Sequence, residues 1–352
     1  MRVRAAAPLF VLLLTIGAVI VRWSSRDAID LRTVPAVAAD ARADRALSDA
    51  EVERLARTIE RSVAYVEDLF QRSFALKPKV LLFATRASFS EGVADRLGYS
   101  AGAATSLAAN HGGVFDPETS TIAMNLEALD TNGVAPTLEH ELTHLMVREA
   151  TSGRALPTWF EEGIATLAER HPAATPRWLE QEGLIGSAIA ASRRMSFAKL
   201  NTLDSWHSTF PRFGDALYAY TAQAVGLMRA QLAWSGVLEM LASVSAGRDL
   251  DEAYRSRAGE TLAQLEARLE AVPPAIITRT RPAGDVEWTL FTGVPLAPSV
   301  VSISGRSTYV VMFTVITDDL GIYRGTFGST APLGAYVLSA AGARAEITTS
   351  RP

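Results

Sequence analysis

The chain has 352 residues, of which 48% are apolar and 20% are charged, and this composition is typical of a folded globular protein rather than a disordered one. The formal net charge is only −4, and no basic stretch is interleaved with aromatic residues, which argues against nucleic acid as a partner. The chain contains no cysteine. Disulfides and thiolate metal sites are therefore excluded, and any zinc ion must be held by histidine and carboxylate side chains.

An uncharged segment of 17 residues, from position 5 to position 21, follows a start that contains two arginines. This length is near the minimum for a membrane-spanning helix, so a signal peptide and an uncleaved anchor both fit. We favour an anchor within residues 1–26, because the one suitable cleavage pattern, at 36–38, lies far behind the apolar segment. The flanking charges favour a cytoplasmic N-terminus. We therefore expect a single-pass cell-membrane protein whose body lies outside the cytoplasm, or a secreted or periplasmic protein if the segment is cleaved.

Residues 27–47 show no periodicity, and we expect them to form a linker. A capping-box pattern over Ser48–Glu51 then predicts the start of a long amphipathic helix that runs to about Gln71. Beyond it the pattern predicts a buried strand over 79–84, a helix over 86–97, and two strands over 112–115 and 121–125 that pair as a hairpin.

The segment from His140 to His144 reads His-Glu-Leu-Thr-His, which is the H-E-x-x-H pattern of zinc proteases. On a helix the two histidines lie one turn apart and about 40° from each other around the axis, so they can hold one metal ion. Glu141 lies beside them and is placed to act on a metal-bound water. Leucines and Met146 fall on the opposite side, where they should pack into a core. Pro136 suits the first turn of this helix.

A second pattern, W-x-x-E-G-x-A, is formed by Trp159, Glu162, Gly163 and Ala165. Seventeen residues separate the second histidine of the first pattern from Glu162. The two patterns together resemble the gluzincin metallopeptidases, whose third zinc ligand is the glutamate of this segment on the next helix. The resemblance implies one Zn²⁺ per chain, held by the two histidines and Glu162. It selects Glu162 over Glu161, which falls about 100° away around the helix.

Two histidines and one glutamate leave the fourth position of a tetrahedral zinc open for water, which is typical of a catalytic site. Glu141 would then take a proton from the attacking water and pass it to the leaving amine. Gly163, next to the ligand, should leave room where two helices converge.

A donor to the oxyanion is still needed, and related gluzincins often supply it as a tyrosine or histidine from a later helix. The segment 215–228 resembles the Y-x-Q-S helix of peptidase-MA-like proteins, with Tyr218 at the tyrosine position. Tyr220 and Thr221 stand where that family commonly has Gln and Ser, so the donor is open between Tyr218, Tyr220 and a histidine, and Tyr218 could equally be a core residue. The other three histidines have no partner at ligand spacing, and we expect them to be ordinary surface or loop residues: His111, His171 and His207.

The fold class that these patterns predict is α+β. The resemblance covers residues 48–272 and implies a mainly helical zincin-type peptidase domain with a small N-terminal mixed sheet, in which one strand of the hairpin is the edge that binds the substrate backbone. Two closing helices are expected over 247–254 and 259–266. A Pro-Pro pair at 273–274 marks a boundary, and the β-rich runs over 275–352 predict a small all-β, sandwich-like domain, either a spacer or a docking module for a substrate or partner protein.

The sequence therefore predicts a membrane-tethered, extracytoplasmic zinc peptidase acting on peptides or proteins. An endopeptidase is favoured over an aminopeptidase, because the G-x-M-E-N segment of that branch is only partly matched over residues 123–125. The competing hypothesis is a zincin-fold scaffold or binding protein without turnover. Glu141 argues against it, since a pure scaffold does not need the base.

Overall fold

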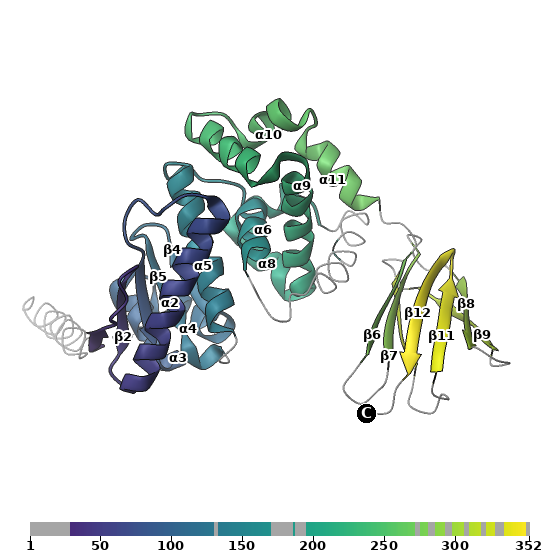
Figure 1. Ribbon diagram of the computed structural model, residues 1–352, viewed down its shortest axis with the longest axis horizontal. Helices are drawn as coiled ribbons and strands as arrows, with labels where there is room; N and C mark the ends of the chain where they lie inside the picture. The colour runs from purple at the N-terminus through teal and green to yellow at the C-terminus, as the bar shows by residue number, and fades with distance from the viewer. Residues whose placement is uncertain are drawn as a thin grey trace, which may run out of the picture. The chain divides into compact units, whose positions relative to one another are not determined.

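The computed structural model describes residues 29–129, 133–169, 186, 195–271, 275–280, 286–292, 298–305, 310–317, 322–327 and 334–349. Over these residues the chain is an α+β protein, in which a mixed sheet with helices is followed by a helical region and then by strands (Figure 1). The chain divides into two compact units. The first is Met1–Arg61 with Leu76–Val134, and the second is Ser62–Ala75 with Ala135–Pro352.

The first unit contains a five-stranded sheet in the order β1-β2-β3-β5-β4. Its strands are β1 (Leu31–Thr33), β2 (Asp40–Asp44), β3 (Lys79–Phe83), β4 (Gly113–Asp116) and β5 (Thr121–Asn125). β2, β3 and β5 run parallel, while β1 and β4 pair antiparallel at the two edges. Parallel neighbours need long crossovers, which the helices α2 (Asp49–Phe70), α3 (Arg86–Arg96) and α4 (Ala101–Asn110) supply.

Several predicted elements of this unit are confirmed. The hairpin exists as β4 and β5, in antiparallel register from Gly113 opposite Met124 to Asp116 opposite Thr121. The capping box of α2 is formed, with the Ser48 amide donating to Glu51 Oε2 at 2.7 Å and the Glu51 amide to Ser48 Oγ at 3.3 Å. One apolar cluster joins α3 and α4 to the sheet; it includes Phe83, Phe89, Val93, Ala104 and Ala123.

The linker predicted over residues 27–47 is wrong between positions 31 and 44, where the chain forms β1 and β2. The β2 sequence is Asp-Ala-Arg-Ala-Asp, and only two alanines, Ala41 and Ala43, carry its buried face. Two methyl groups between charged residues give no detectable hydrophobic period. The strand exists because its backbone pairs with β1 and β3, and this is tertiary context that the local sequence does not contain.

The helical part of the second unit is built around α9 (Asp215–Ser245), which carries a kink at Ala233, where φ is 56° and ψ is 174°. The helices α6 (Thr158–Ala168), α8 (Leu203–Phe213) and α10 (Leu250–Ala258) each contact α9 (Figure 1). The expected closing helices are confirmed as α10 and α11 (Leu262–Glu270). The helix α5 (Val134–Ala150) precedes them, and a short 3₁₀ turn, η2 (Ala198–Leu200), comes before α8.

The strands that follow form two antiparallel sheets, in the orders β10-β7-β6 and β12-β11-β8-β9. They are β6 (Ala275–Thr280), β7 (Val286–Phe291), β8 (Pro298–Gly305), β9 (Val310–Ile316), β10 (Ile322–Phe327), β11 (Gly334–Ala340) and β12 (Ala343–Thr349). One buried cluster takes side chains from both sheets, among them Trp288, Leu290, Val301 and Leu338. The β-rich C-terminal segment is thus confirmed as two sheets that share a core; the predicted Pro-Pro boundary lies outside the described residues.

Among the helices that the structure describes, none combines the length and the apolar character needed to cross a membrane. The predicted anchor within residues 1–26 lies outside the described part of the chain.

Candidate metal centre

Helix α5 presents the two histidines. Pro136 lies in its first turn, and the leucines at 138, 142 and 145 are buried together with Met146, as predicted. The buried residues fix the rotation of the helix about its axis, so the opposite face carries His140 and His144. Their side chains are 13% and 14% exposed. The two imidazole centroids lie 4.9 Å apart. The helix therefore places two nitrogen donors side by side at a partly open surface.

Helix α6 brings the carboxylate. Glu162 Oε2 lies 3.3 Å from His140 Nε2, and Glu162 Oε1 lies 3.7 Å from His144 Nε2. Two ligand atoms about 2.0–2.1 Å from one tetrahedral ion are about 3.3 Å apart, which matches the distance to His140, while the distance to His144 is 0.4 Å longer. These three residues form a group whose candidate ligand atoms all lie within 4.8 Å of one another. Two imidazoles and a carboxylate, without sulfur, are a ligand set that divalent transition-metal ions such as zinc and iron use in proteins.

His140 contacts a second carboxylate that the sequence patterns did not indicate. Its Nδ1 lies 3.1 Å from Oε2 of Glu169, the C-cap residue of α6. The two ring nitrogens thus have separate tasks: Nε2 faces Glu162 and Nδ1 faces Glu169. A carboxylate on the far nitrogen fixes the tautomer and the ring orientation of a metal-ligating histidine. The sequence spacing could have identified Glu169. It follows Glu162 by seven residues, and residues seven apart on a helix lie on almost the same face.

The protonation of the pair reflects these contacts. Burial disfavours the charged ring of His140, but hydrogen bonds to Glu162 and Glu169, together with their charges, raise the pKa of His140 well above its ordinary value. For His144, burial lowers the pKa to about 4, against the opposing charge of Glu162. The carboxylates thus concentrate negative charge around His140, which favours binding of a cation, and His144 beside it is held in its neutral form.

The proposed base and donor also lie at this group. Glu141 is buried on α5, and Tyr218 comes from the first turn of α9, with its ring centroid 6.3 Å from that of His140. Burial raises the pKa of Tyr218 well above its ordinary value, and the charges of Glu162, Glu141 and Glu169 raise it further. Tyr218 thus stays protonated and able to donate, within the electrostatic reach of three carboxylates.

The alternatives weighed from the sequence lie elsewhere. The hydroxyl of Tyr220 donates to Glu266 on α11 at 3.4 Å, and the Glu161 carboxylate accepts from the backbone amide of Leu156. Among the described residues, neither His111 nor His207 belongs to the ligand group, and His171 lies outside the described residues. Of the two tyrosines and two glutamates, the geometry places Tyr218 and Glu162 at the histidines.

A close approach of α6 to α9 sets the position of Glu162 relative to Tyr218. A Cβ atom on Gly163 would lie 2.5 Å from the carbonyl oxygen of Thr221 and 3.0 Å from a methyl group of Val225. Glycine at this position lets the helix that carries Glu162 pack directly on the helix that carries Tyr218. The expected reason for Gly163 was the convergence of α5 and α6 on the ion; the observed neighbour is α9.

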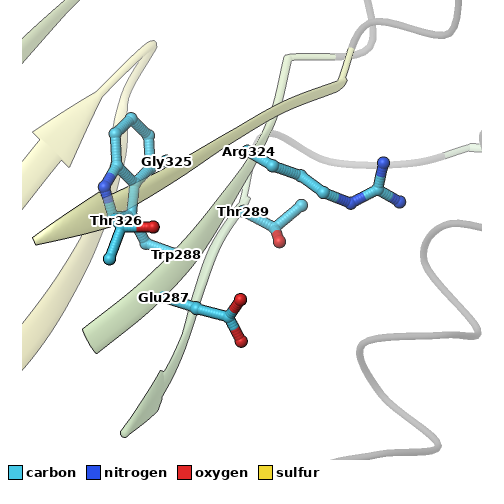
Figure 2. A pocket seen from close by; sticks show the side chains of 6 residues that line it. All are labelled: Glu287, Trp288, Thr289, Arg324, Gly325 and Thr326. Atoms are coloured by element: carbon cyan, nitrogen blue, oxygen red, sulfur yellow. The ribbon is translucent and has the colours of Figure 1, made fainter. Parts of the chain in front are cut away.

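A separate pocket of about 260 Å³ lies on the three-stranded C-terminal sheet, between β7 and β10. In Figure 2 the side chains of Glu287, Thr289 and Arg324 project from one face of the sheet, while the Trp288 indole lies on the other. Its lining is more polar than apolar and holds both signs of charge. It lacks the apolar walls typical of small-molecule sites, so the metal group is the stronger functional candidate.

A search against family models and curated proteins finds no match for this chain.

Proposed function

We propose that this protein is a zinc-dependent peptidase of the gluzincin type, similar to the peptidase-MA-like family, and that its zincin-type domain hydrolyses peptide bonds. The observation that carries the proposal is the convergence of His140, His144 and Glu162 at ligand distances. Glu141 and Tyr218 lie at the same group, so a candidate metal site, a candidate base and a candidate hydrogen-bond donor occur together.

Each residue has a task in such a reaction. A zinc ion in this site would polarise the scissile carbonyl and make water a better nucleophile at neutral pH. Glu141 would accept the proton of the attacking water and deliver it to the leaving amine. Tyr218, kept protonated by its surroundings, would donate a hydrogen bond to the carbonyl oxygen as negative charge develops there.

The alternative of a silent scaffold explains less. Holding a metal ion requires the two histidines, Glu162 and an orienting partner such as Glu169. It requires neither a buried glutamate between the ligands nor a protonated phenol beside them. Burial of a polar group costs free energy that hydrogen bonds or ion pairs must offset, and the peptidase reaction gives both groups a use that a scaffold lacks.

We further propose that the apolar segment over residues 5–21 attaches the protein to a membrane, with the peptidase outside the cytoplasm. A reporter fused after Pro352 is then expected to behave as exported and to sediment with membranes. Recovery of the protein in the soluble fraction with a new N-terminus near Ala39 would instead identify a cleaved signal peptide.

The peptidase proposal is tested with full-length protein and four variants, comparing zinc content with cleavage of a peptide library. We expect about one zinc per chain in the wild type and in His207→Ala, a control histidine outside the group, and zinc loss in His144→Ala and Glu162→Ala. Glu141→Gln should keep zinc but cleave about 10²–10⁴-fold more slowly. Chelator-insensitive or absent cleavage by the wild type, with zinc bound, would favour the scaffold.

A further inference from the structure

The side chain of Tyr218 is enclosed by two aromatic residues from α8. Trp206 and Phe210 lie one turn apart on this helix, and their ring centroids are 5.1 Å and 5.6 Å from that of Tyr218. Both rings meet the phenol edge to face, at 77° and 78°. The phenol ring therefore cannot swing away from the metal group without disturbing α8.

One of these neighbours also makes a polar contact with the phenol. The Trp206 side chain is fully buried, and its indole N–H is a donor that opposes the rise in the pKa of Tyr218, as a donor beside the phenol oxygen does. An indole nitrogen can only donate, so in a hydrogen bond between the two side chains the Tyr218 oxygen must be the acceptor. The phenolic proton therefore cannot point at Trp206, and the hydroxyl must donate in another direction.

The direction left is the one that the reaction needs. The ring of Tyr218 faces His140, and the nearest charged groups are the carboxylates at the metal centre. A donated hydrogen bond on the phenol oxygen also stabilises charge that accumulates there when the hydroxyl itself donates to an oxyanion, because hydrogen bonds in a chain polarise one another.

We propose that Trp206 is a positioning residue for the peptidase reaction. Its indole N–H occupies the acceptor side of the Tyr218 hydroxyl and so directs the phenolic proton at the carbonyl oxygen of the substrate. This inference rests on the proposed function, since it assigns Trp206 a role in the step that Tyr218 performs. Trp206 does not touch the substrate and acts only through Tyr218.

The start of α8, which carries Trp206, is capped and is also bonded to the helix that carries Glu162. Thr202 and Ser205 form the capping box at the start of α8, and Ser205 directly precedes Trp206. A formed cap holds the first turn of a helix in place. Just before this cap, the carbonyl of Asn201 accepts from the amide of Thr158, the first residue of α6, at 3.2 Å. The turn that positions Trp206 is thus bonded to the helix that carries Glu162.

Two substitutions separate hydrogen bonding from packing. Trp206→Phe keeps an aromatic ring against Tyr218 but removes the N–H, while Phe210→Leu changes the ring contact and leaves the N–H intact. With full-length, zinc-loaded protein and a cleaved peptide, Trp206→Phe should lower kcat about tenfold and change KM less than about twofold, as expected for a contact used only in the transition state. Phe210→Leu should change kcat less than about threefold.

A double mutant tests whether the effect passes through the tyrosine. Tyr218→Phe is expected to lower kcat about 10²–10³-fold. In that background Trp206→Phe should have no further effect, because the hydroxyl that it positions is gone. An equal tenfold loss from Trp206→Phe with and without the Tyr218 hydroxyl would overturn the proposal.

A spectroscopic measurement on metal-free, full-length protein tests the hydrogen bond without using activity. The chain has six tryptophans, so ¹⁵N-labelled tryptophan gives up to six indole signals, and the Trp206 signal is the one missing in Trp206→Phe. That signal should move upfield in Tyr218→Phe and stay in place in Phe210→Leu. An unmoved signal in Tyr218→Phe would contradict the proposal. If instead wild type never cleaves a peptide but this shift occurs, the proposed function fails while the hydrogen bond stands.

Discussion

The contact between His140 and Glu169 determines how one metal ligand is held. When a metal ion is bound, the carboxylate at Nδ1 would hold the ring proton on that nitrogen and leave Nε2, on the side of Glu162, to bind the ion. We expect Glu169→Gln to weaken zinc binding about 10–100-fold, because an amide is a poorer partner for the Nδ1–H than a carboxylate. The measurement is a titration of zinc against a competing chromophoric chelator.

The control is Glu161→Gln, measured above pH 8, where Glu161 is ionised as well, so that it removes an equal charge one residue from Glu162 but leaves the His140 contact intact. Its carboxylate is bonded to the amide of Leu156. If the two variants lose zinc affinity equally, then general negative charge, and not the contact of Glu169 with His140, governs binding.

Glu161 itself predicts a pH dependence of stability in the metal-free protein. Burial, together with the neighbouring charge of Glu162, raises the pKa of Glu161 from 4.5 to about 7. Folding therefore favours the neutral form of the Glu161 carboxyl. The stability associated with this neutral form is fully present below pH 4.5 and is lost as the pH rises to about 7. Relative to wild type, Glu161→Gln should gain about 2–3 kcal/mol in the free energy of unfolding across this window. Urea midpoints at pH 4.5, 6 and 8, with chelator, measure it; a constant difference at all three would contradict the assignment.

At the scale of elements, the packing of α6 on α9 holds Glu162 and Tyr218 in one site. A Cβ on Gly163 would overlap the Thr221 carbonyl, which is backbone and cannot move aside cheaply. We expect Gly163→Ala to lower the free energy of unfolding by about 1–3 kcal/mol and to weaken zinc binding in parallel. Thermal melting and zinc titration give the two quantities.

Gly226 provides the matched control, because it lies in α9 and has nothing within 4 Å of its Cβ position. Gly226→Ala should stabilise the protein by up to about 1 kcal/mol, since alanine is the better helix former. Similar destabilisation in both variants would mean that helix geometry, and not the contact with Thr221, makes Gly163 necessary.

The elements also show what the sequence could and could not predict. The helices α5 and α6 were predictable because each carries a recognisable sequence motif together with apolar residues on one face. Leu142 on α5 and Trp159 on α6 are examples of these buried residues. β2 was not, because its two alanines carry too little hydrophobic signal and backbone pairing makes the strand. Helix α8 was missed as well. Its cap at Thr202 uses a serine in place of the usual glutamate, and Pro211 lies near its end, so the segment that holds Tyr218 had a weak signature.

At the scale of the whole molecule, the metal group and the C-terminal sheets have separate sets of residues. The residues proposed as ligands, base and donor all come from positions 140–218, whereas the two sheets bury a cluster drawn from positions 276–340. The sequence indicated this division through the change from helical to alternating patterns near the Pro-Pro pair. A domain with its own core is expected to unfold on its own.

Trp288 is the residue through which this independence can be tested in the full-length chain. Its buried indole packs over Gly325 and contacts the rings of Tyr323 and Phe313, at centroid distances of 5.2 Å and 6.2 Å. Trp288→Ala should cost the sheets about 3–5 kcal/mol, so their unfolding, followed by calorimetry, should move to lower temperature and separate from that of the helical region. Zinc content below that transition should equal that of the wild type and of Met312→Ala, an exposed control on β9. Loss of zinc in Trp288→Ala at temperatures where the helices remain folded would show that the metal centre depends on the C-terminal sheets.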